Sequence, residues 1–219
     1  MNAIETTNLH EFETMPMAEC PDVAGTPTGG GFFATKFWVK PQNLFVALIV
    51  APKDPRHFEG IQWKIERTST LGARSLYDGY ANLQAMDDDL HPIAKACRAL
   101  EIGGKRDWYP PSKNELSAIY EALAPCSGGN PEQTVAEGFR DGEAEAYEPG
   151  YYLSSTEFST GTAWLQNFGD GLQHLWLKNY RNRCRAVRKC KPSLPTSPWS
   201  NFLRPITTAV SVSAQPQAP

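Results

Sequence analysis

The sequence has no long hydrophobic run: its longest apolar stretch, residues 44–51, has eight residues. A membrane-spanning helix needs about 20 apolar residues, so we expect no membrane insertion. The opening segment MNAIETTNLHEFETM contains acids and neither a basic nor an apolar region, which argues against a secretory signal peptide. We therefore expect a soluble protein made in a cytosol.

The chain also has little net charge. It contains 21 lysines and arginines against 24 aspartates and glutamates, a formal charge of -3. A protein that binds polyanions through its overall field is strongly basic, and no standard nucleic-acid-binding module is present. We therefore expect no nucleic-acid partner.

Cysteine and histidine are too sparse for common catalytic or metal sites. The five cysteines are Cys20, Cys97, Cys126, Cys184 and Cys190. Without a secretory signal they are expected as free thiols. Six residues of extended chain would separate Cys184 from Cys190 by about 20 Å, too far for one zinc ion. With four histidines, a Ser-His-Asp triad requires a coincidence of folding, so we expect no enzyme, metal or cofactor.

Composition divides the chain into three parts. Residues 1–30 are polar and lead into a triple glycine, which predicts an N-terminal arm. Residues 31–191 are rich in aromatic residues and predict one domain. Residues 192–219 contain six prolines and form an extended C-terminal tail that cannot build its own core. We expect both ends to be ordered by other chains. The aromatic and aliphatic residues that would anchor the tail are Trp199, Phe202, Leu203 and Ile206.

Periodicity inside the domain predicts helices and short strands. Segments 32–39 and 44–51 form a hairpin, and 61–66 alternates as a third strand. A helix is expected over 89–101 with Asp89 as its cap, and another over 112–123, where Ser112 and Glu115 form a capping box. Residues 126–149 contain six acids and one arginine, which predicts a solvated surface insertion.

Four short strands are expected to complete the domain, at 151–154, 163–168, 172–178 and 183–189. Two helices among short antiparallel strands indicate the α+β class.

Four motifs in the second half of the domain occur in a specific order: DWYPPSKNEL at 107–116, GYYLSSTE at 150–157, AWLQNF at 163–168 and RAVR at 185–188. This series resembles the collagen-like-adhesin C-terminal (Lcl C-terminal) domain family, although Leu153 stands where the family has tryptophan. Residues 29–51 and 75–82 look like the longer form found in phage and prophage proteins. The resemblance implies a C-type-lectin-like fold, related to formylglycine-generating enzymes and used for recognition, and it brings no catalytic residues.

The most informative local feature is the hairpin around Asp170-Gly171, a pair typical of two-residue type I′ turns. The turn predicts that Phe168 pairs with Gln173 and that one face of the hairpin is apolar. The opposite face and the residues beyond it form the predicted contact surface: Asn167, His174, Trp176, Lys178, Asn179, Tyr180 and Arg181. A tryptophan beside polar groups suits a sugar, but packing against another subunit or the tail explains the same face equally well.

Two charged runs have alternative explanations. Residues 178–191 contain seven basic residues and no acid, which indicates either a solvated strand edge or a site for an anionic glycan or phosphate-bearing polymer. Asp87, Asp88 and Asp89 could ligate calcium, yet acids at a helix N-terminus are the simpler account.

Together these features predict a non-enzymatic phage virion protein, namely a tail-fibre or baseplate subunit that binds a bacterial surface glycan or other receptor. The expected partners are other virion proteins and copies of itself, with a trimer as one possibility. One alternative is an architectural capsid-decoration or baseplate subunit that binds no glycan. The other is a formylglycine-generating-type enzyme, which the spacing of Cys184 and Cys190 disfavours.

Overall fold

Most of the apolar stretch at 44–51 forms a strand that is buried on both faces from Val46 onward. The computed structural model describes residues 12–53, 57–124 and 134–193. Strand β4 (Leu44–Val50) places alternate side chains on opposite faces. Val46, Leu48 and Val50 join the main core, whereas Ala47, Ile49 and Ala51 join a second apolar cluster. Burial on both faces explains why this segment is continuously apolar.

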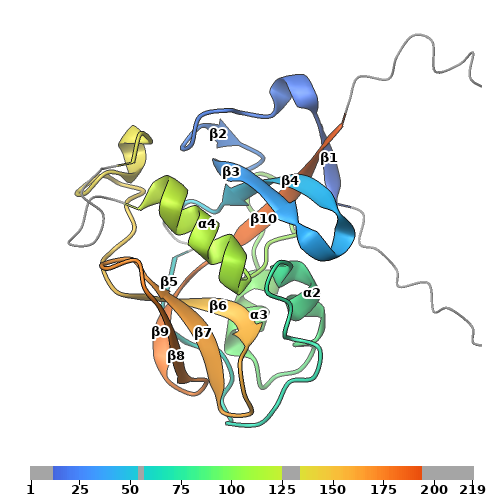
Figure 1. Ribbon diagram of the computed structural model, residues 1–219, viewed down its shortest axis with the longest axis vertical. Helices are drawn as coiled ribbons and strands as arrows, with labels where there is room; N and C mark the ends of the chain where they lie inside the picture. Colours follow the sequence, from blue (N-terminus) through green and yellow to red (C-terminus); the bar gives the residue numbers. More distant parts are fainter. Residues whose placement is uncertain (1–11, 54–56, 125–133, 194–219) are drawn as a thin grey trace, which may run out of the picture.

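Strands dominate the structure and form two sheets (Figure 1). The first sheet contains, in order, β1 (Glu13–Pro16), β10 (Val187–Ser193), β4, β3 (Gly31–Val39) and β2 (Pro27–Thr28). The second contains, in order, β5 (His57–Gln62), β9 (Arg181–Arg185), β6 (Tyr151–Glu157), β7 (Thr162–Asn167) and β8 (Gln173–Leu177). The expected hairpin of β3 and β4 is confirmed, but the strand expected at 61–66 is wrong for most of its length: β5 lies at His57–Gln62 and residues 63–66 are not a strand.

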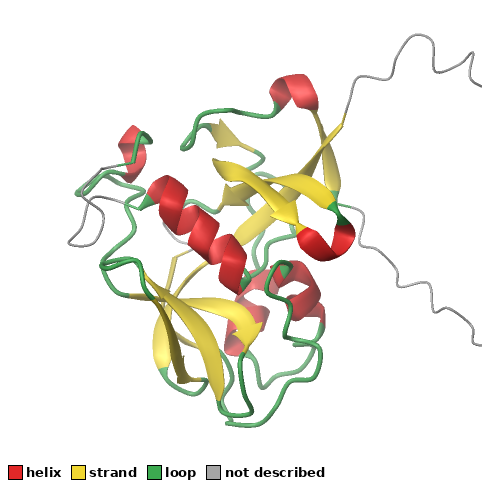
Figure 2. Cartoon of the chain, viewed as in Figure 1, coloured by secondary structure: helices red, strands yellow, loops and turns green. Residues whose placement is uncertain are grey.

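The helices are few and short (Figure 2). They are α2 (Gly79–Gln84), α3 (Pro92–Arg98) and α4 (Lys113–Leu123), with 3-10 turns η1 (Met17–Glu19), η2 (Lys40–Gln42) and η3 (Glu137–Phe139). Helix α4 begins at the predicted capping box, in which Ser112 Oγ accepts from the amide of Glu115 at 3.4 Å. It packs on β3 of one sheet and on β6 and β7 of the other, so it closes the core between the sheets.

The α+β, C-type-lectin-like fold class predicted from the sequence is wrong. The described residues form two mixed five-stranded sheets with only three short α-helices. Each sheet contains one parallel pair, β1 with β10 and β6 with β9, beside its antiparallel pairs. The expected helix over 89–101 is only α3, and His91, not Asp89, occupies its N-cap. The expected strand at 183–189 is two strands, because the chain passes from one sheet to the other at Ala186.

Two segments expected to lie outside the core contribute to it. Residues 12–30, expected as part of an arm, supply β1 and β2, and the side chain of Phe12 is buried in the main core. The described part of the predicted surface insertion, residues 134–149, buries the rings of Phe139 and Tyr147. The acids of this segment are interspersed with buried apolar residues, so composition alone did not reveal its packing.

In the parts of the chain that the structure describes, no helix has the length and apolar character needed to cross a bilayer.

Candidate functional site

The hairpin that carries the predicted contact surface has a longer turn than expected. Gln166 pairs with Gln173, and Leu165 pairs with His174, so the register differs by two residues from the prediction. The cause is Phe168, which leaves the strand to stack on Tyr147 with ring centroids 4.2 Å apart. A two-residue slip keeps each side chain on its predicted face, so His174 and Trp176 still share a face.

The two faces of the hairpin are not divided into core and solvent as expected. Leu165, predicted on the open face, is buried in the main core, while Leu175, predicted in the core, is 38% exposed. Strand β8 is the edge of its sheet, so little covers its outer residues. Asn167 bonds within its own turn, where its Nδ2 donates to Asp170 Oδ2 at 2.9 Å, so it shapes the loop and is not presented to a ligand.

Lys178 does not belong to the contact surface. Its side chain is fully buried, with Nζ 3.4 Å from Glu157 Oε1 and 4.6 Å above the ring of Trp63. Burial lowers the pKa of Lys178, and the carboxylate of Glu157 acts in the opposite direction. Strand β8 ends at Leu177, and residues 178–180 turn away from it. The alternation of faces that predicted an exposed Lys178 amine therefore does not extend to this residue.

The basic run at 178–191 is mostly internal, which overturns the expectation of a solvated strand edge. Besides Lys178, three members are buried: Arg185, Arg188 and Lys189. Each of the three has a carboxylate partner, namely Glu145 for Arg185, Glu13 and Asp107 for Arg188, and Asp78 and Glu115 for Lys189. Several of these carboxylates lie in the motifs noted above, so those motifs build internal ion pairs. A buried charge requires such a partner.

An exposed aromatic cluster is formed by side chains from β6, β8 and the turn after β8. The ring of Trp176, which is 42% exposed, stacks on Tyr151 with centroids 5.8 Å apart and 19° between the ring planes. His174 meets Tyr151 edge-on at 5.2 Å, and Tyr180 meets Trp176 edge-on at 6.2 Å. We call these four residues the aromatic face. The prediction found three of them and missed Tyr151.

A groove of about 240 Å³ adjoins the aromatic face, since Tyr151 belongs to both. Its lining residues are Glu59, Gly60, Tyr151, Arg181, Asn182 and Arg183. Tyr151 begins β6 directly after Gly150, whose φ of +121° is strained for other residues and whose added Cβ would lie 2.9 Å from Arg183 Nη1. The glycine therefore lets Tyr151 and Arg183 come close together.

Buried polar atoms without a partner concentrate in this region. Seven such side-chain atoms occur in the described part of the chain. Four belong to the aromatic face or to residues next to it: His174 Nε2, Asn179 Oδ1, Asn182 Nδ2 and Arg183 Nε. A buried polar atom without a partner costs about 1–3 kcal/mol, and such groups in native proteins call for an explanation such as a ligand, ion or water. This concentration marks the region as the candidate site.

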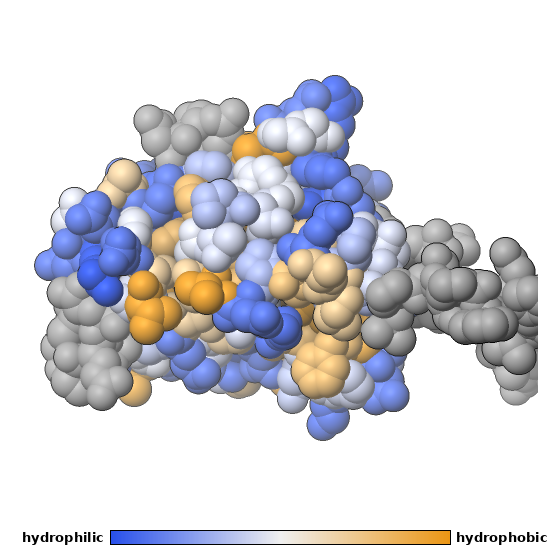
Figure 3. Space-filling model, turned by 90° about the horizontal axis from the view of Figure 1, so that it is seen from above, coloured by the Kyte–Doolittle hydropathy of each residue, from blue (hydrophilic) through white to orange (hydrophobic). Residues whose placement is uncertain are grey.

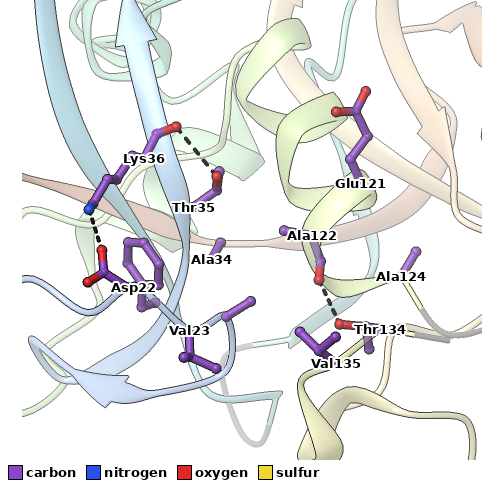
Figure 4. A pocket seen from close by; sticks show the side chains of 12 residues that line it. Asp22, Val23, Ala34, Thr35, Lys36, Glu121, Ala122, Ala124, Thr134 and Val135 are labelled. Carbon is purple, nitrogen blue, oxygen red and sulfur yellow. Dashed lines mark hydrogen bonds and ion pairs between the residues drawn. The ribbon is translucent and has the colours of Figure 1, made fainter.

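A larger groove of about 600 Å³ lies between β3, α4 and residues 134–135 (Figure 4). Several of its polar groups have partners: Lys36 Nζ donates to Asp22 at 2.5 Å, and Thr134 Oγ1 donates to the carbonyl of Ala122 at 2.6 Å. None of the seven unpartnered atoms of the described chain lines it. On the face shown in Figure 3, hydrophobic residues form small patches separated by hydrophilic ones. Because the unpartnered polar atoms lie near the smaller groove, we choose that groove as the candidate site.

A threonine, a histidine and an aspartate also form a hydrogen-bonded chain. Thr70 Oγ1 lies 2.8 Å from His91 Nε2, and His91 Nδ1 lies 2.5 Å from Asp88 Oδ1. The order matches a catalytic triad, but Thr70 is only 6% exposed and its hydroxyl also accepts from Lys64 Nζ at 3.1 Å. Burial lowers the pKa of His91. This series of hydrogen bonds links the loop before α2 to the start of α3. The hydroxyl of Thr70 is buried within it and is not accessible to a substrate.

The four cysteines that the structure describes are buried free thiols, the acidic run is paired with basic side chains, and Cys126 lies outside the described residues. Burial and the neighbouring thiol of Cys184 raise the pKa of Cys97, and Cys190 Sγ accepts from Arg188 Nη1 at 3.2 Å. Cys184 and Cys190 belong to different apolar clusters. Each acid at 87–89 faces a basic side chain: Arg98 for Asp87, His91 for Asp88 and Lys95 for Asp89. In the described part of the chain no group of three acids, histidines or cysteines could hold a metal ion.

The predicted tail anchors Trp199, Phe202, Leu203 and Ile206 lie outside the described residues.

Comparison with known proteins gives distant structural similarity and no family assignment. No family model matches the chain, and no curated protein matches it. Among solved structures, a fimbrial protein from Bacteroides ovatus is similar at a TM-score of 0.46 and 15% identity. The match covers 80% of this chain and 42% of the fimbrial protein, so the chain spans less than half the length of that neighbour.

Proposed function

We propose that this chain is a non-enzymatic recognition subunit of a phage particle and that its aromatic face binds a bacterial surface glycan. The observation that carries the proposal is the stacked Tyr151–Trp176 pair, exposed beside a groove with unpartnered polar atoms. Sugar rings stack on aromatic side chains, while a few fixed polar groups orient them. The ordered motifs that resemble adhesin and phage domains support a role in recognition.

The glycan part of the proposal is tested with the purified full chain on an array of bacterial capsule and lipopolysaccharide oligosaccharides. Trp176→Ala should weaken binding at least tenfold, about 1.4 kcal/mol, because the stacking surface is lost. Trp38→Ala is the matched control: Trp38 is similarly exposed, at 37%, and its ring lies 4.5 Å from that of Phe45, tilted by 54°, in the first sheet and not in the sheet that carries Trp176. Equal binding by both variants and the wild type would refute a role for the aromatic face.

The virion part is tested separately. An antibody raised against the chain should label phage particles purified from the strain that encodes it. If the particles contain the chain and Trp176→Ala blocks their assembly, the aromatic face is an interface between subunits, and the architectural alternative is correct. If particles assemble normally but no longer adsorb to bacteria, the face binds the receptor. Absence of the chain from purified particles would refute the virion assignment.

A further inference from the structure

Resting on the recognition role proposed above, we infer that the ligand is a saccharide carrying an oxyanion, either a carboxylate or a phosphate. The oxyanion is held by Arg181 and Arg183 in the groove beside the aromatic face. The inference names the chemical class of the ligand and the residues that select it.

The first observation is the difference between these two arginines and their neighbours in sequence. Lys178, Arg185, Arg188 and Lys189 are buried, and each forms an ion pair with a carboxylate. Arg181 and Arg183 form no ion pair with any described residue. Their hydrogen bonds go to neutral backbone carbonyls: Arg181 Nη1 to Gly60 O at 2.6 Å, and Arg183 Nη1 to Pro149 O at 3.4 Å. The internal pairing of the basic run thus leaves two cationic groups together at one groove.

The second observation is the donor capacity that remains. A guanidinium has five N–H donors in a planar fork that matches two oxygens of a carboxylate or phosphate. Arg183 Nε is buried without a partner, and so is the donor Nδ2 of the neighbouring Asn182. Because these two residues are consecutive in β9, their side chains point to opposite faces of the strand. The unpartnered Arg183 Nε therefore calls for an acceptor of its own. Glu59 contributes a negative charge to the lining, so the two arginines leave the groove with one excess positive charge.

The third observation is the position of Tyr151. Its side chain lines the groove and also stacks on Trp176. A ring placed against the aromatic face would therefore direct one substituent towards the arginines. The groove, at about 240 Å³, is smaller than the roughly 300–1,000 Å³ of pockets that enclose drug-sized ligands. It suits one charged substituent, while the sugar ring that bears it lies on the aromatic face.

The test compares charged and uncharged forms of the same saccharide by titration calorimetry on the full chain. The probes are trigalacturonic acid and its trimethyl ester, and galactose 6-phosphate and galactose. In 50 mM NaCl a charged probe should bind at least tenfold more tightly than its neutral form. The difference should shrink in 0.5 M NaCl, because salt screens exposed charges. Arg181→Gln and Arg183→Gln should remove the preference and retain the affinity for the neutral form.

Lys191→Gln is the matched control, because Lys191 is an exposed member of the same basic run outside the groove. This variant changes the net charge equally and should keep the preference; circular dichroism in the near ultraviolet verifies that each variant is folded. Preference for the phosphate over the uronate assigns the oxyanion to a phosphate, and the reverse assigns it to a carboxylate.

Equal binding of charged and neutral probes, both lost in Trp176→Ala, would overturn the oxyanion inference and leave saccharide recognition standing. A loss of preference in Lys191→Gln equal to that in the arginine variants would also overturn it, since the effect would then be one of overall charge. No binding of any probe at 10 mM overturns the inference as well, while the array experiment with Trp176→Ala decides the recognition role independently.

Discussion

Replacement of Lys178 by methionine should destabilise the fold without acting through a ligand. The ammonium of Lys178 lies 3.4 Å from Glu157 Oε1, donates to Thr68 O at 2.9 Å and sits over the Trp63 ring. Both side chains of the ion pair are fully buried. Removing one member of a buried pair costs about 3–5 kcal/mol, because the other charge stays in a poor environment.

The structure places this substitution near the lower end of that range. Glu157 keeps hydrogen bonds from Ser69 Oγ and from the amide of Thr70, both at 2.8 Å, and an ion pair with Arg74 at 3.4 Å. We therefore expect Lys178→Met to lower the free energy of unfolding by about 3 kcal/mol. Glu157→Gln should cost a similar amount, and the double variant should cost about 2 kcal/mol less than the sum.

The assay is urea denaturation of the four proteins, with the slope against urea compared to confirm two-state behaviour. The pH dependence gives an independent check. Burial alone would raise the pKa of Glu157, but hydrogen bonds from Ser69 and Thr70 and the charge of Lys178 lower it below 4.5. The contribution of the pair is thus present above pH 4.5 and is lost as pH falls through the lowered pKa, so wild type and Lys178→Met should converge in acid. A cost below about 0.5 kcal/mol, or no coupling in the double variant, would refute the buried placement.

Two further substitutions test the core. Burial is the main cause that lowers the pKa of His91 below 6.5, against the opposing effect of Asp88. As pH falls below 6.5 the unfolded state takes up a proton that the folded state does not, so stability declines. His91→Gln should reduce the decline of the unfolding free energy between pH 6.5 and 5. An unchanged slope of that free energy against pH would contradict this. Phe168→Ala should cost about 3–5 kcal/mol, because the ring is buried against Tyr147 and Tyr152. Thermal unfolding measures that cost, with the exposed Leu172→Ala as control, and a loss under 1 kcal/mol would show that the turn does not depend on this ring.

Features of the fold that depend on residues close in sequence were predictable. The capping box joins Ser112 to Glu115, three residues away, and the structure contains it. The hairpin of β3 and β4 follows from two strand-like segments, at 32–39 and 44–51, on either side of a short connection. The mixed character of the sheets was not predictable, because the parallel pairs join segments that are far apart. Glu13 pairs with Cys190, and Tyr152 pairs with Arg183. No pattern of neighbouring residues predicts either pairing.

The candidate site was predicted in part for the same reason. His174, Trp176 and Tyr180 are close in sequence, so alternation placed them together. Lys178 was misplaced because its partners Glu157 and Trp63 are 21 and 115 residues away, and only the folded chain brings them together. Tyr151 was missed for a similar reason, since its contacts cross from β6 to β8. One local feature could have drawn attention to Tyr151: Gly150 directly precedes it, and the strand that follows begins with two adjacent tyrosines.

The parallel pairing of β1 with β10 determines how the described fold bears mechanical load. Glu13 lies opposite Cys190 and Pro16 lies opposite Ser193, so the chain enters at one end of the pair and leaves at the other. Tension between these two points pulls the strands past each other, and the evenly spaced bonds of a parallel pair resist it together. The ion pair of Arg188 with Glu13 adds a side-chain bond across the same two strands. A protein attached through both ends would therefore hold its first sheet closed under tension, and its lifetime under load would follow the rate of forced unfolding.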